Sequence, residues 1–186
     1  MALTIFNFTS MNLWHDIPRG EDLTQELNVI IEIPRGSLNK YEIDKESGLI
    51  ALDRVSHTGQ TFPFDYGFVP QTLWEDGDAP DVIVLTTEPL FPGILVHVRP
   101  VAIMHMNDSG DSDDKVIGVP VNDPRWAQVK DINDVNPHTL KVIQHFYENY
   151  KKLQNKVVTV SGFEGKDAAQ KAVQKSVKLY SEKFAK

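Results

Sequence analysis

Residues 74–82 read WEDGDAPDV and lead directly into the apolar run VIVL at residues 82–85. Four carboxylates fall within seven residues of this stretch, at positions 75, 76, 78 and 81. In an extended chain Asp76 and Asp78 project from the same face, while Gly77 permits a tight turn. Carboxylates held about 4 Å apart repel each other by roughly 4 kcal/mol at an effective dielectric of about 20. A folded chain tolerates such a cluster by full solvation, by a raised pKa or by a bound cation. The apolar strand that follows directly, which has the composition of a buried strand, favours the cation site.

A second acidic cluster strengthens that interpretation. Residues 107–115 read NDSGDSDDK and precede the apolar run at residues 116–121. Both clusters lie where a strand meets a turn, which is where a rigid scaffold presents its ligands. Neither cluster has the glycine at the sixth position and the glutamate at the twelfth that an EF-hand loop requires. Oxygen ligands without nitrogen or sulfur select hard ions, so we expect Mg²⁺, Mn²⁺ or Ca²⁺.

Outward from these clusters, short runs bounded by Gly and Pro predict β-strands. The expected strands lie at residues 29–33, 40–44, 49–55, 82–85, 94–106, 116–121 and 157–160. The segment 94–106 is either one long strand or a bent pair, with Arg99-Pro100 as a kink or edge. Glu32 interrupts the run 29–33, where burial of an unpaired carboxylate is costly. From that run alone we expect an edge strand with Glu32 facing water.

The aromatic-rich stretch at residues 61–70 fits no simple period. It is either a packed core loop or a site rim at which Tyr66 donates its hydroxyl. Further on, Asn136 and Pro137 have the residue types of an N-cap and a first helical position. Apolar side chains then recur at helical spacing over about four turns, at positions 140, 143, 146, 147, 150 and 153. A last helix, expected to serve packing only, begins near Asp167.

The chain has 186 residues, 41% of them hydrophobic, with a net charge of −7 and no cysteine. A chain of this size can bury one core, so we expect a single domain over residues 1–186. The lack of cysteine excludes disulfides, thiolate nucleophiles and cysteine-ligated zinc, and it is consistent with a cytoplasmic location. The negative charge argues against nucleic acid or an anionic membrane as the main partner. Neither a signal peptide nor a bilayer-spanning run is recognisable.

Motifs of other chemistries are absent from the sequence. It has no Gly-x-Gly-x-x-Gly turn, no P-loop and no Gly-x-Ser-x-Gly elbow, and its six histidines are scattered. The side chains left to carry a reaction are the clustered carboxylates and the basic residues. Two metal ions about 3.5–4 Å apart can share a water and lower its pKa towards neutrality, which would suit phosphoryl transfer to water. Basic residues that could neutralise phosphate oxygens are Lys40, Arg54, Lys115 and Lys151.

These residues also resemble a known family. Residues 76–82, DGDAPDV, look like the Asp-x-Asp-x-x-Asp signature of the soluble family I inorganic pyrophosphatases. Six further motifs follow in the order that the family has them. They are Glu32-Ile33-Pro34, residues 40–44, Asp53-Arg54-Val55, residues 65–68, residues 108–115 and Tyr150-Lys151. The resemblance covers about residues 13–163, and seven motifs in register make it specific.

The resemblance implies a role for each matching residue. Asp78 would be the catalytic general base, or the carboxylate that orients the attacking hydroxide. Several Mg²⁺ ions, replaceable by Mn²⁺ or other divalent ions, would be bound by Asp76, Asp81, Asp108 and Asp113, with support from Glu32. The oxygens of the substrate would be held by Lys40, Arg54, Tyr66, Lys115, Tyr150 and Lys151. The implied reaction is Mg²⁺-dependent hydrolysis of inorganic pyrophosphate to two phosphates.

The same resemblance implies an α+β, mainly β fold: a five-stranded OB-like antiparallel β-barrel with two flanking C-terminal helices. It also implies a homo-oligomer, with a homohexamer favoured over a dimer. Four features depart from the family pattern, namely the Ala79-Pro80 pair, Phe62, Ser109 and Phe163. None of these departures removes a residue to which metal binding or catalysis is assigned.

Two other functions stay open from the sequence. A non-catalytic β-barrel that binds divalent cations or phosphate would keep the acidic site, although a site that only binds cations needs neither Asp78 nor Lys40. A nucleic-acid-binding OB module would have a suitable fold, but the acidic clusters and the negative net charge disfavour it. We therefore expect inorganic pyrophosphate as the partner, with no nucleic acid and no membrane.

Overall fold

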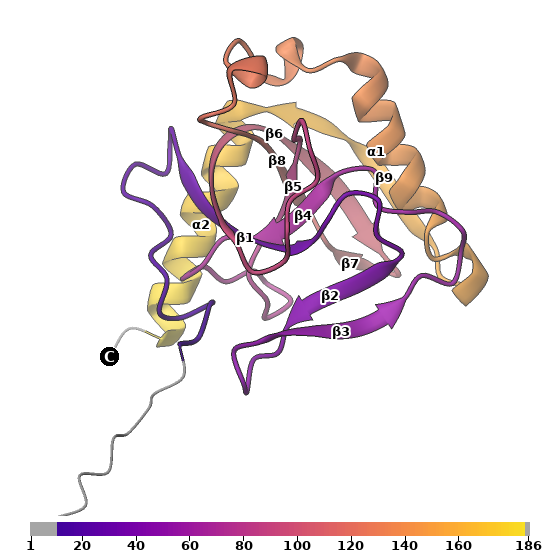
Figure 1. Cartoon of the computed structure of the whole chain (residues 1–186), viewed down its shortest axis with the longest axis horizontal. Helices are drawn as coiled ribbons and strands as arrows, with labels where there is room; N and C mark the ends of the chain where they lie inside the picture. The colour runs from indigo at the N-terminus through magenta and orange to yellow at the C-terminus, as the bar shows by residue number, and fades with distance from the viewer. Residues whose placement is uncertain (1–10, 185–186) are drawn as a thin grey trace, which may run out of the picture.

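Five strands close into a barrel in the computed structural model, which describes residues 11–184 (Figure 1). They are β1 (Leu27–Ile33), β4 (Asp65–Phe68), β5 (Asp81–Val84), β6 (Leu95–Asp108) and β8 (Lys115–Pro120). The ring runs β1-β4-β5-β8-β6, and β6 pairs again with β1. Four of its pairs are antiparallel, whereas β5 and β8 are parallel because β6 carries the chain back between them. The predicted five-stranded OB-like barrel is confirmed, with this one parallel pair as a difference.

A hairpin and two short pairings extend the β structure beyond the ring. The hairpin lies below the barrel in Figure 1 and consists of β2 (Asn39–Ile43) and β3 (Ile50–Val55). Two more strands, β7 (Asp111–Ser112) and β9 (Val158–Gly165), pair with β6. β9 continues beyond the predicted end at residue 160 because it follows β6 as far as Ala102.

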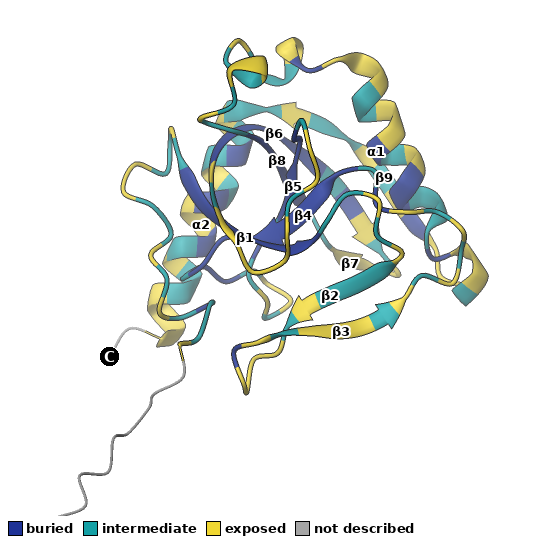
Figure 2. Ribbon diagram, in the orientation of Figure 1, coloured by how far each residue is buried: buried dark blue, intermediate teal, exposed yellow. Residues whose placement is uncertain are grey.

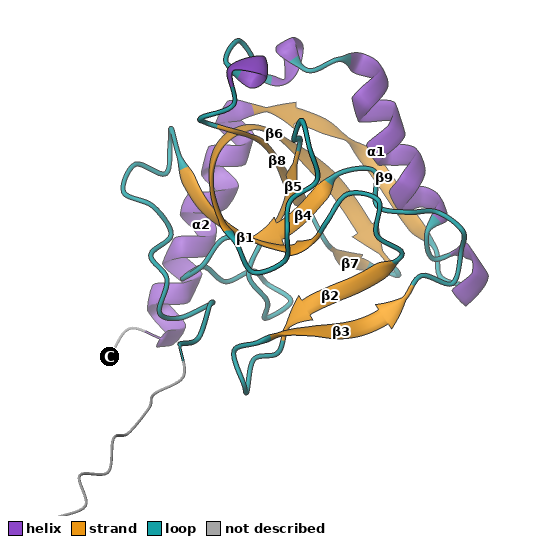
Figure 3. Cartoon of the chain, in the orientation of Figure 1, coloured by secondary structure: helices purple, strands orange, loops and turns teal. Residues whose placement is uncertain are grey.

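Two helices flank the barrel on different sides (Figure 3). They are α1 (Pro137–Asn149) and α2 (Lys166–Phe184), and the 3-10 turns are η1 (Pro124–Trp126), η2 (Ile132–Asp134) and η3 (Lys152–Gln154). The predicted N-cap is confirmed, since the Asn136 side chain accepts a hydrogen bond from the His138 N–H at 2.9 Å. Within residues 11–184, neither helix has the length and apolar composition needed to cross a membrane. Residues 1–10, on which the expected lack of a signal peptide rests, lie outside the described part.

The ring strands are buried almost throughout (Figure 2) because successive residues enter two different apolar clusters. In β5, Ile83 belongs to the cluster that includes side chains of α1, whereas Val82 and Val84 belong to the cluster that includes side chains of α2. This alternation follows from the two-residue period of a strand. Strands buried on both faces read as continuous apolar runs, which explains the run at residues 82–85.

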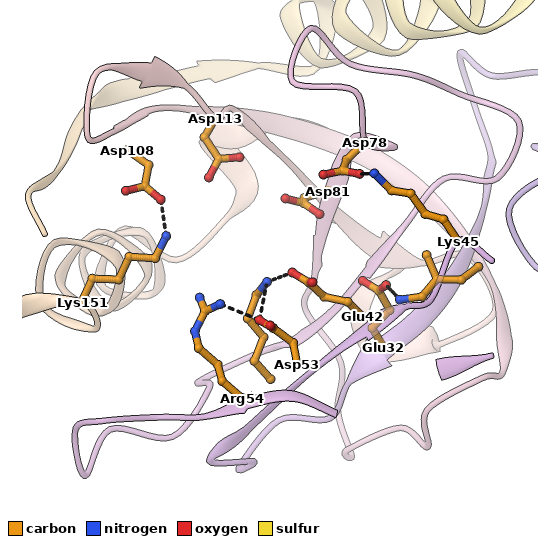
Figure 4. Close-up of polar contacts among 12 residues, drawn as sticks. Glu32, Glu42, Lys45, Asp53, Arg54, Asp78, Asp81, Asp108, Asp113 and Lys151 are labelled. Atoms are coloured by element: carbon orange, nitrogen blue, oxygen red, sulfur yellow. Dashed lines mark hydrogen bonds and ion pairs between the residues drawn. The ribbon is translucent and has the colours of Figure 1, made fainter. Parts of the chain in front are cut away.

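Glu32 does not face water, and the prediction of an edge strand there was wrong. β1 pairs with β4 on one side and with β6 on the other, and Glu32 is 5% exposed. The register of β1 against β4 shifts between Ile31 and Ile33, so Glu32 is the extra residue of a β-bulge. A bulge redirects a side chain relative to the regular pleat, and Glu32 points into the region drawn in Figure 4.

Gly77 provides the tight turn that the sequence allowed, so Asp76 and Asp78 are not held in an extended chain. They lie in a turn around Gly77, which has a φ of +93°. The Asp76 carboxylate accepts a hydrogen bond from the Asp78 N–H at 2.9 Å. Such hydrogen bonds, between an aspartate side chain and the backbone two residues further on, compete with extended structure and close turns instead.

The sequence left open whether residues 94–106 form one long strand or a bent pair. They lie in β6, which is one 14-residue strand with a register shift at Pro100–Ala102.

Candidate active site

A cavity of about 370 Å³ lies where the acidic turn, the barrel and the β2–β3 hairpin meet (Figure 4). All twelve residues that the resemblance assigns to the site line it: Glu32, Lys40, Arg54, Tyr66, Asp76, Asp78, Asp81, Asp108, Asp113, Lys115, Tyr150 and Lys151. These residues are spread over more than a hundred positions of the chain. Only the closed barrel, with the hairpin across it, brings them together.

The turn before β5 supplies three of the carboxylates. Although Asp76 is exposed, partial loss of solvent around its carboxylate raises its pKa, and the negative charges of Asp78 and Asp81 add to this rise. Asp78 lies at the more open edge of the cavity with about half of its side chain exposed, and it forms an ion pair with Lys45. Asp81 begins β5 and is the register partner of Lys115 on β8. The parallel pair of strands therefore fixes an acid and a base side by side.

Lys115 is the most deeply buried cation of the site, at 2% exposed. Its Nζ lies 2.5 Å from Oδ2 of Asp81 and also pairs with Asp113. Burial alone would lower the pKa of this ammonium, but the charges of Asp81 and Asp113 outweigh burial and raise the pKa above its ordinary value. Lys115 therefore remains charged and keeps two carboxylates close together that would otherwise repel each other.

The end of β6 and the segment leading to β8 supply the other two aspartates. Asp108 ends β6 and forms an ion pair with Lys151 (Figure 4). Burial works against ionisation of Asp108, but the hydrogen bond and charge of Lys151 lower its pKa overall. Asp113 has the opposite balance, because burial raises its pKa in spite of Lys115. The two carboxylates differ in their readiness to release a proton.

Glu32 lies at the back of the cavity. Its Oε1 accepts a hydrogen bond from the Ile43 N–H at 2.7 Å, which ties β1 to the hairpin. Burial, followed by the charge of Asp81, raises its pKa to about 8, although the Ile43 hydrogen bond and Lys40 act in the other direction. A carboxyl group in this position holds its proton at neutral pH unless a cation compensates for the negative charge.

The hairpin and the end of α1 supply the cations and hydroxyls opposite the aspartates. Lys40 and Arg54 are register partners on β2 and β3. Burial lowers the pKa of Lys40, although the charge of Asp81 raises it in part. Tyr150 is the C-cap of α1, and burial raises the pKa of its hydroxyl well above the ordinary value. It therefore remains a hydrogen-bond donor next to Lys151.

The aromatic stretch at residues 61–70 is not a loop throughout, since its residues 65–68 form β4, which was not predicted, and Tyr66 lies in this strand. The residue is 6% exposed and belongs to the apolar core, yet it also lines the cavity. The Nζ atom of Lys115 lies 5.9 Å from the centroid of its ring. Of the departures from the family pattern, Phe62 is buried against Phe146 at a centroid distance of 4.9 Å, and Ser109 adopts a left-handed φ of +58°.

Further polar side chains line the cavity that were not predicted as site residues. They are Glu42, Lys45, Asp111 and Ser112. Glu42 pairs with Lys40, and Asp53 lies 3.5 Å from the same ammonium beside Arg54. The signal for Glu42 and Asp53 was present in the sequence, since both stand within one or two positions of a predicted cation. Their part is to orient Lys40 and Arg54 towards the cavity.

The donor set of the cavity fits a hard divalent cation. Its carboxylates offer oxygen alone, and such ligands suit Mg²⁺ or Mn²⁺. Within residues 11–184 no three acidic or histidine side chains are already gathered around one point, because ammonium groups such as that of Lys115 lie between them. Mg²⁺ is commonly held by only one or two carboxylates and keeps several waters. One or two of the carboxylates that line the cavity are therefore enough to hold such an ion.

The chain is similar in sequence and in structure to known proteins. A family profile described as inorganic pyrophosphatase matches residues 29–181. The inorganic pyrophosphatase of Haloferax volcanii is 44% identical over 176 residues, which cover 94% of this chain and 99% of that protein. The soluble inorganic pyrophosphatase of Zea mays is 44% identical over 91% of this chain and 79% of its own length. The crystal structure of inorganic pyrophosphatase from Thermus thermophilus superposes with a TM-score of 0.89 at 44% identity, covering 92% of this chain and 99% of that one.

Proposed function

Since this chain belongs to the inorganic pyrophosphatase family of hydrolases, we propose that its cavity hydrolyses pyrophosphate to two phosphates with Mg²⁺. The family implies a divalent metal cofactor in general. The observation that carries this assignment is the charge of the cavity wall. Eight carboxyl groups face five cationic side chains, an excess of three acids. A pyrophosphate anion alone would be repelled by such a wall. Divalent cations reconcile an acidic cavity with an anionic substrate.

The residues proposed to hold these ions are Asp76, Asp81, Asp108 and Asp113, with Glu32 supporting a further ion directly or through water. When bound, Mg²⁺ supplies neutralisation of phosphate charge and lowers the pKa of a bound water. The raised pKa values of Glu32, Asp76 and Asp113 support this assignment. Carboxyl groups whose ionisation is unfavourable in the folded chain gain most from a neighbouring cation.

The basic and hydroxyl groups are proposed to bind the substrate. Their positions around one cavity support a role in holding the two phosphates, through Lys40, Arg54, Tyr66, Lys115, Tyr150 and Lys151. Arg54 offers a planar fork of donors that matches phosphate geometry. Burial keeps the hydroxyls of Tyr66 and Tyr150 protonated by raising their pKa values. Both can therefore donate hydrogen bonds to phosphate oxygens and to the leaving phosphate.

Asp78 is proposed as the general base, or as the group that orients the attacking water. Asp78 lines the cavity, and about half of its side chain is exposed to solvent. Its hydrogen-bonded backbone fixes it in the turn, two residues from Asp76. Both partners of the Asp78–Lys45 ion pair are about half exposed, so water can reach the Asp78 carboxylate, whereas the Asp81 carboxylate is 27% exposed and pairs with the buried Lys115.

The direct experiment is phosphate release from pyrophosphate at slightly alkaline pH with excess Mg²⁺ and then with EDTA. ATP and a simple phosphomonoester serve as competing substrates. We expect fast, Mg²⁺-dependent release from pyrophosphate. A folded protein that binds Mg²⁺ but releases no phosphate would refute the catalytic assignment and favour a binding module that kept the site without the reaction.

The role of Asp78 is tested by Asp78→Asn, which keeps the size of the side chain and removes its basicity. We expect kcat to fall by roughly 10²–10⁴-fold, the range for loss of a general base, with unchanged unfolding by urea. Asp22→Asn is a matched control, since Asp22 is an exposed loop acid hydrogen-bonded to Thr24. Full activity of the Asp78 variant would exclude the assignment.

We also propose that residues 1–186 form one domain and that the protein is located in the cytoplasm. We propose that it assembles as a homohexamer, with a dimer as the alternative. Large apolar side chains on the surface support assembly, since Phe91 is 79%, Leu153 67% and Val157 71% exposed. Mn²⁺ or another divalent ion would replace Mg²⁺ in part. Sedimentation equilibrium measures the subunit number, and a monomer at micromolar concentration would refute the assembly.

A further inference from the structure

Asp114 stands between two residues of the proposed site but does not belong to it. Asp113 and Lys115 both line the cavity, whereas Asp114 is not part of the lining. This is the pattern of an extended segment, in which neighbouring side chains project from opposite faces. The Asp114 side chain is nevertheless only 17% exposed. A carboxylate that is withdrawn from solvent and takes no part in the proposed reaction calls for an explanation.

The carboxylate of Asp114 fills a gap in the β-sheet. β7 ends at Ser112 and β8 begins at Lys115, so residues 113 and 114 belong to neither strand. Both backbone groups of Met106 on β6 hold this segment. Its carbonyl accepts a hydrogen bond from the Asp113 N–H at 2.9 Å, and its N–H donates to Oδ1 of Asp114 at 3.0 Å. Met106 is 3% exposed, so its N–H needs a partner within the protein, and a side-chain oxygen serves where a strand would offer a carbonyl.

The second oxygen of Asp114 is held by the neighbouring residue of β6. Its Oδ2 lies 2.8 Å from Nδ1 of His105. An ionised carboxylate can only accept, so Nδ1 carries the hydrogen of this bond. The other ring nitrogen, Nε2, lies 3.2 Å from Oε1 of Glu164 on β9, close to it but outside the geometry of a hydrogen bond. The bonds of Asp114 to Met106 and His105 form a clamp that ties the segment to β6 at both carboxylate oxygens.

The clamp holds a segment that has to change its ionic contacts when a cation binds. Nζ of the buried Lys115 pairs with both Asp81 and Asp113. A divalent cation that binds Asp113 therefore competes with Lys115 for this carboxylate. With the backbone of residue 113 fixed to β6, the carboxylate can turn towards the cation while the end of the strand stays in place. Groups behind a metal ligand that fix its orientation commonly govern metal affinity in this way.

We propose that Asp114, supported by His105, is a positioning residue that ties the backbone of residues 113–115 to β6 and so holds Asp113 where it binds the divalent cation. The inference rests on the proposed function, because it deepens the role given there to Asp113. It does not make Asp114 a catalytic residue, since its side chain is outside the cavity lining.

The test is the binding of Mn²⁺ to the full chain without pyrophosphate, measured by calorimetry. Asp114→Ala removes both bonds of the clamp, and we expect its Kd for Mn²⁺ to rise by about 10-fold, the lower end of the range for groups behind a metal ligand. Asp114→Asn should bind Mn²⁺ nearly as the wild type does. Its amide oxygen still accepts from the Met106 N–H, and its NH₂ can donate to His105 in the other tautomer. Excess Mg²⁺ should restore kcat of the Asp114→Ala protein.

Asp123→Ala is a matched control. The Asp123 side chain is 18% exposed, accepts hydrogen bonds from the Arg125 N–H and the Thr87 hydroxyl, and is outside the cavity lining. Its loss should lower the free energy of unfolding in urea, as the loss of Asp114 does, but leave the Kd for Mn²⁺ unchanged. Loss of affinity in the control as well would reduce Asp114 to a general contribution to stability and overturn the proposal.

A second variant, His105→Ala, leaves the bond to Met106 intact and serves as the test if Asp114→Ala does not fold. It should raise the Kd for Mn²⁺ by a smaller factor than Asp114→Ala, and it should add nothing to the Kd of Asp114→Ala if His105 acts through Asp114. Wild-type affinity in both single variants would overturn the proposal. So would an Asp114→Asn protein as weak as Asp114→Ala, because the charge and not the clamp would then matter. Failure of the proposed function would look different: the wild type itself would bind the cation and release no phosphate.

Discussion

Replacing Glu32 by Gln is the perturbation whose effect follows most directly from the structure. The carboxyl group is 5% exposed and has a pKa raised to about 8, chiefly by burial and then by the charge of Asp81. In the folded chain the group therefore binds its proton more tightly than in the unfolded chain, where the pKa is 4.5. Its contribution to stability is fully present below the unfolded pKa and is lost as pH rises through the folded pKa. Glutamine stays neutral throughout and has no such loss.

The size of the loss follows from the two pKa values. The interval from 4.5 to about 8, at about 1.36 kcal/mol for each pH unit, corresponds to roughly 5 kcal/mol of unfolding free energy. The wild type should therefore lose roughly 5 kcal/mol relative to Glu32→Gln between pH 4.5 and pH 9. Most of this difference accumulates between pH 5 and pH 8. Titrations common to both proteins cancel in the comparison.

Urea unfolding in EDTA at closely spaced pH values measures this difference, with the protein concentration held constant. Repeating the series with saturating Mg²⁺ tests the proposed metal role, because a cation near Glu32 favours the ionised group and should reduce the difference. Parallel pH profiles of the two proteins in EDTA would refute the reasoning. They would mean that the Glu32 carboxyl is either solvated or neutralised in the folded chain by a cationic side chain.

Two further predictions concern the framework of the site. Lys115→Met leaves two half-buried carboxylates without their shared cation, so the unfolding free energy should fall by roughly 2–4 kcal/mol, somewhat below the value for a fully buried pair, in urea titrations with EDTA; an unchanged midpoint would show that the pair is solvated. Gly67→Ala places a Cβ 1.9 Å from the Ile30 carbonyl oxygen and should lower the free energy by about 2–4 kcal/mol. Gly59→Ala, whose Cβ would meet nothing within 4 Å, is its control, and equal melting temperatures would contradict the predicted clash.

Local chemistry was sufficient to place most of the elements. Asn136 predicted the start of α1 because its side chain caps the helix within two residues. The run at residues 82–85 predicted β5 because β-branched residues fit a strand buried on both faces. Local patterns could not predict which strands pair with one another. The parallel pair of β5 and β8 depends on the path of β6 between them, which no local pattern records.

The functional site, like the fold, could be predicted from the sequence only in part. The residue types of the two acidic clusters indicated an oxygen-ligand site before any geometry was known, and family resemblance named twelve residues that all line one cavity. The direction of Glu32 could not be read from its run, because a bulge between Ile31 and Ile33 redirects it. Glu42 and Asp53 stand within two positions of a predicted cation in the sequence, but only the pairing of β2 with β3 shows that both lie beside Lys40.

The kinds of group available could be read from the amino-acid sequence: carboxylates in two clusters, a set of cations and tyrosines, and strands apolar enough to close a core. These are properties of residue types and of short-range periodicity, so they are present in the unfolded chain as well. Which of these groups share one cavity depends on the folded barrel. Burial and neighbouring charge, both consequences of the closed barrel, raise the pKa of Glu32 and keep Lys115 charged between Asp81 and Asp113. Such energies depend on distances between residues remote in sequence.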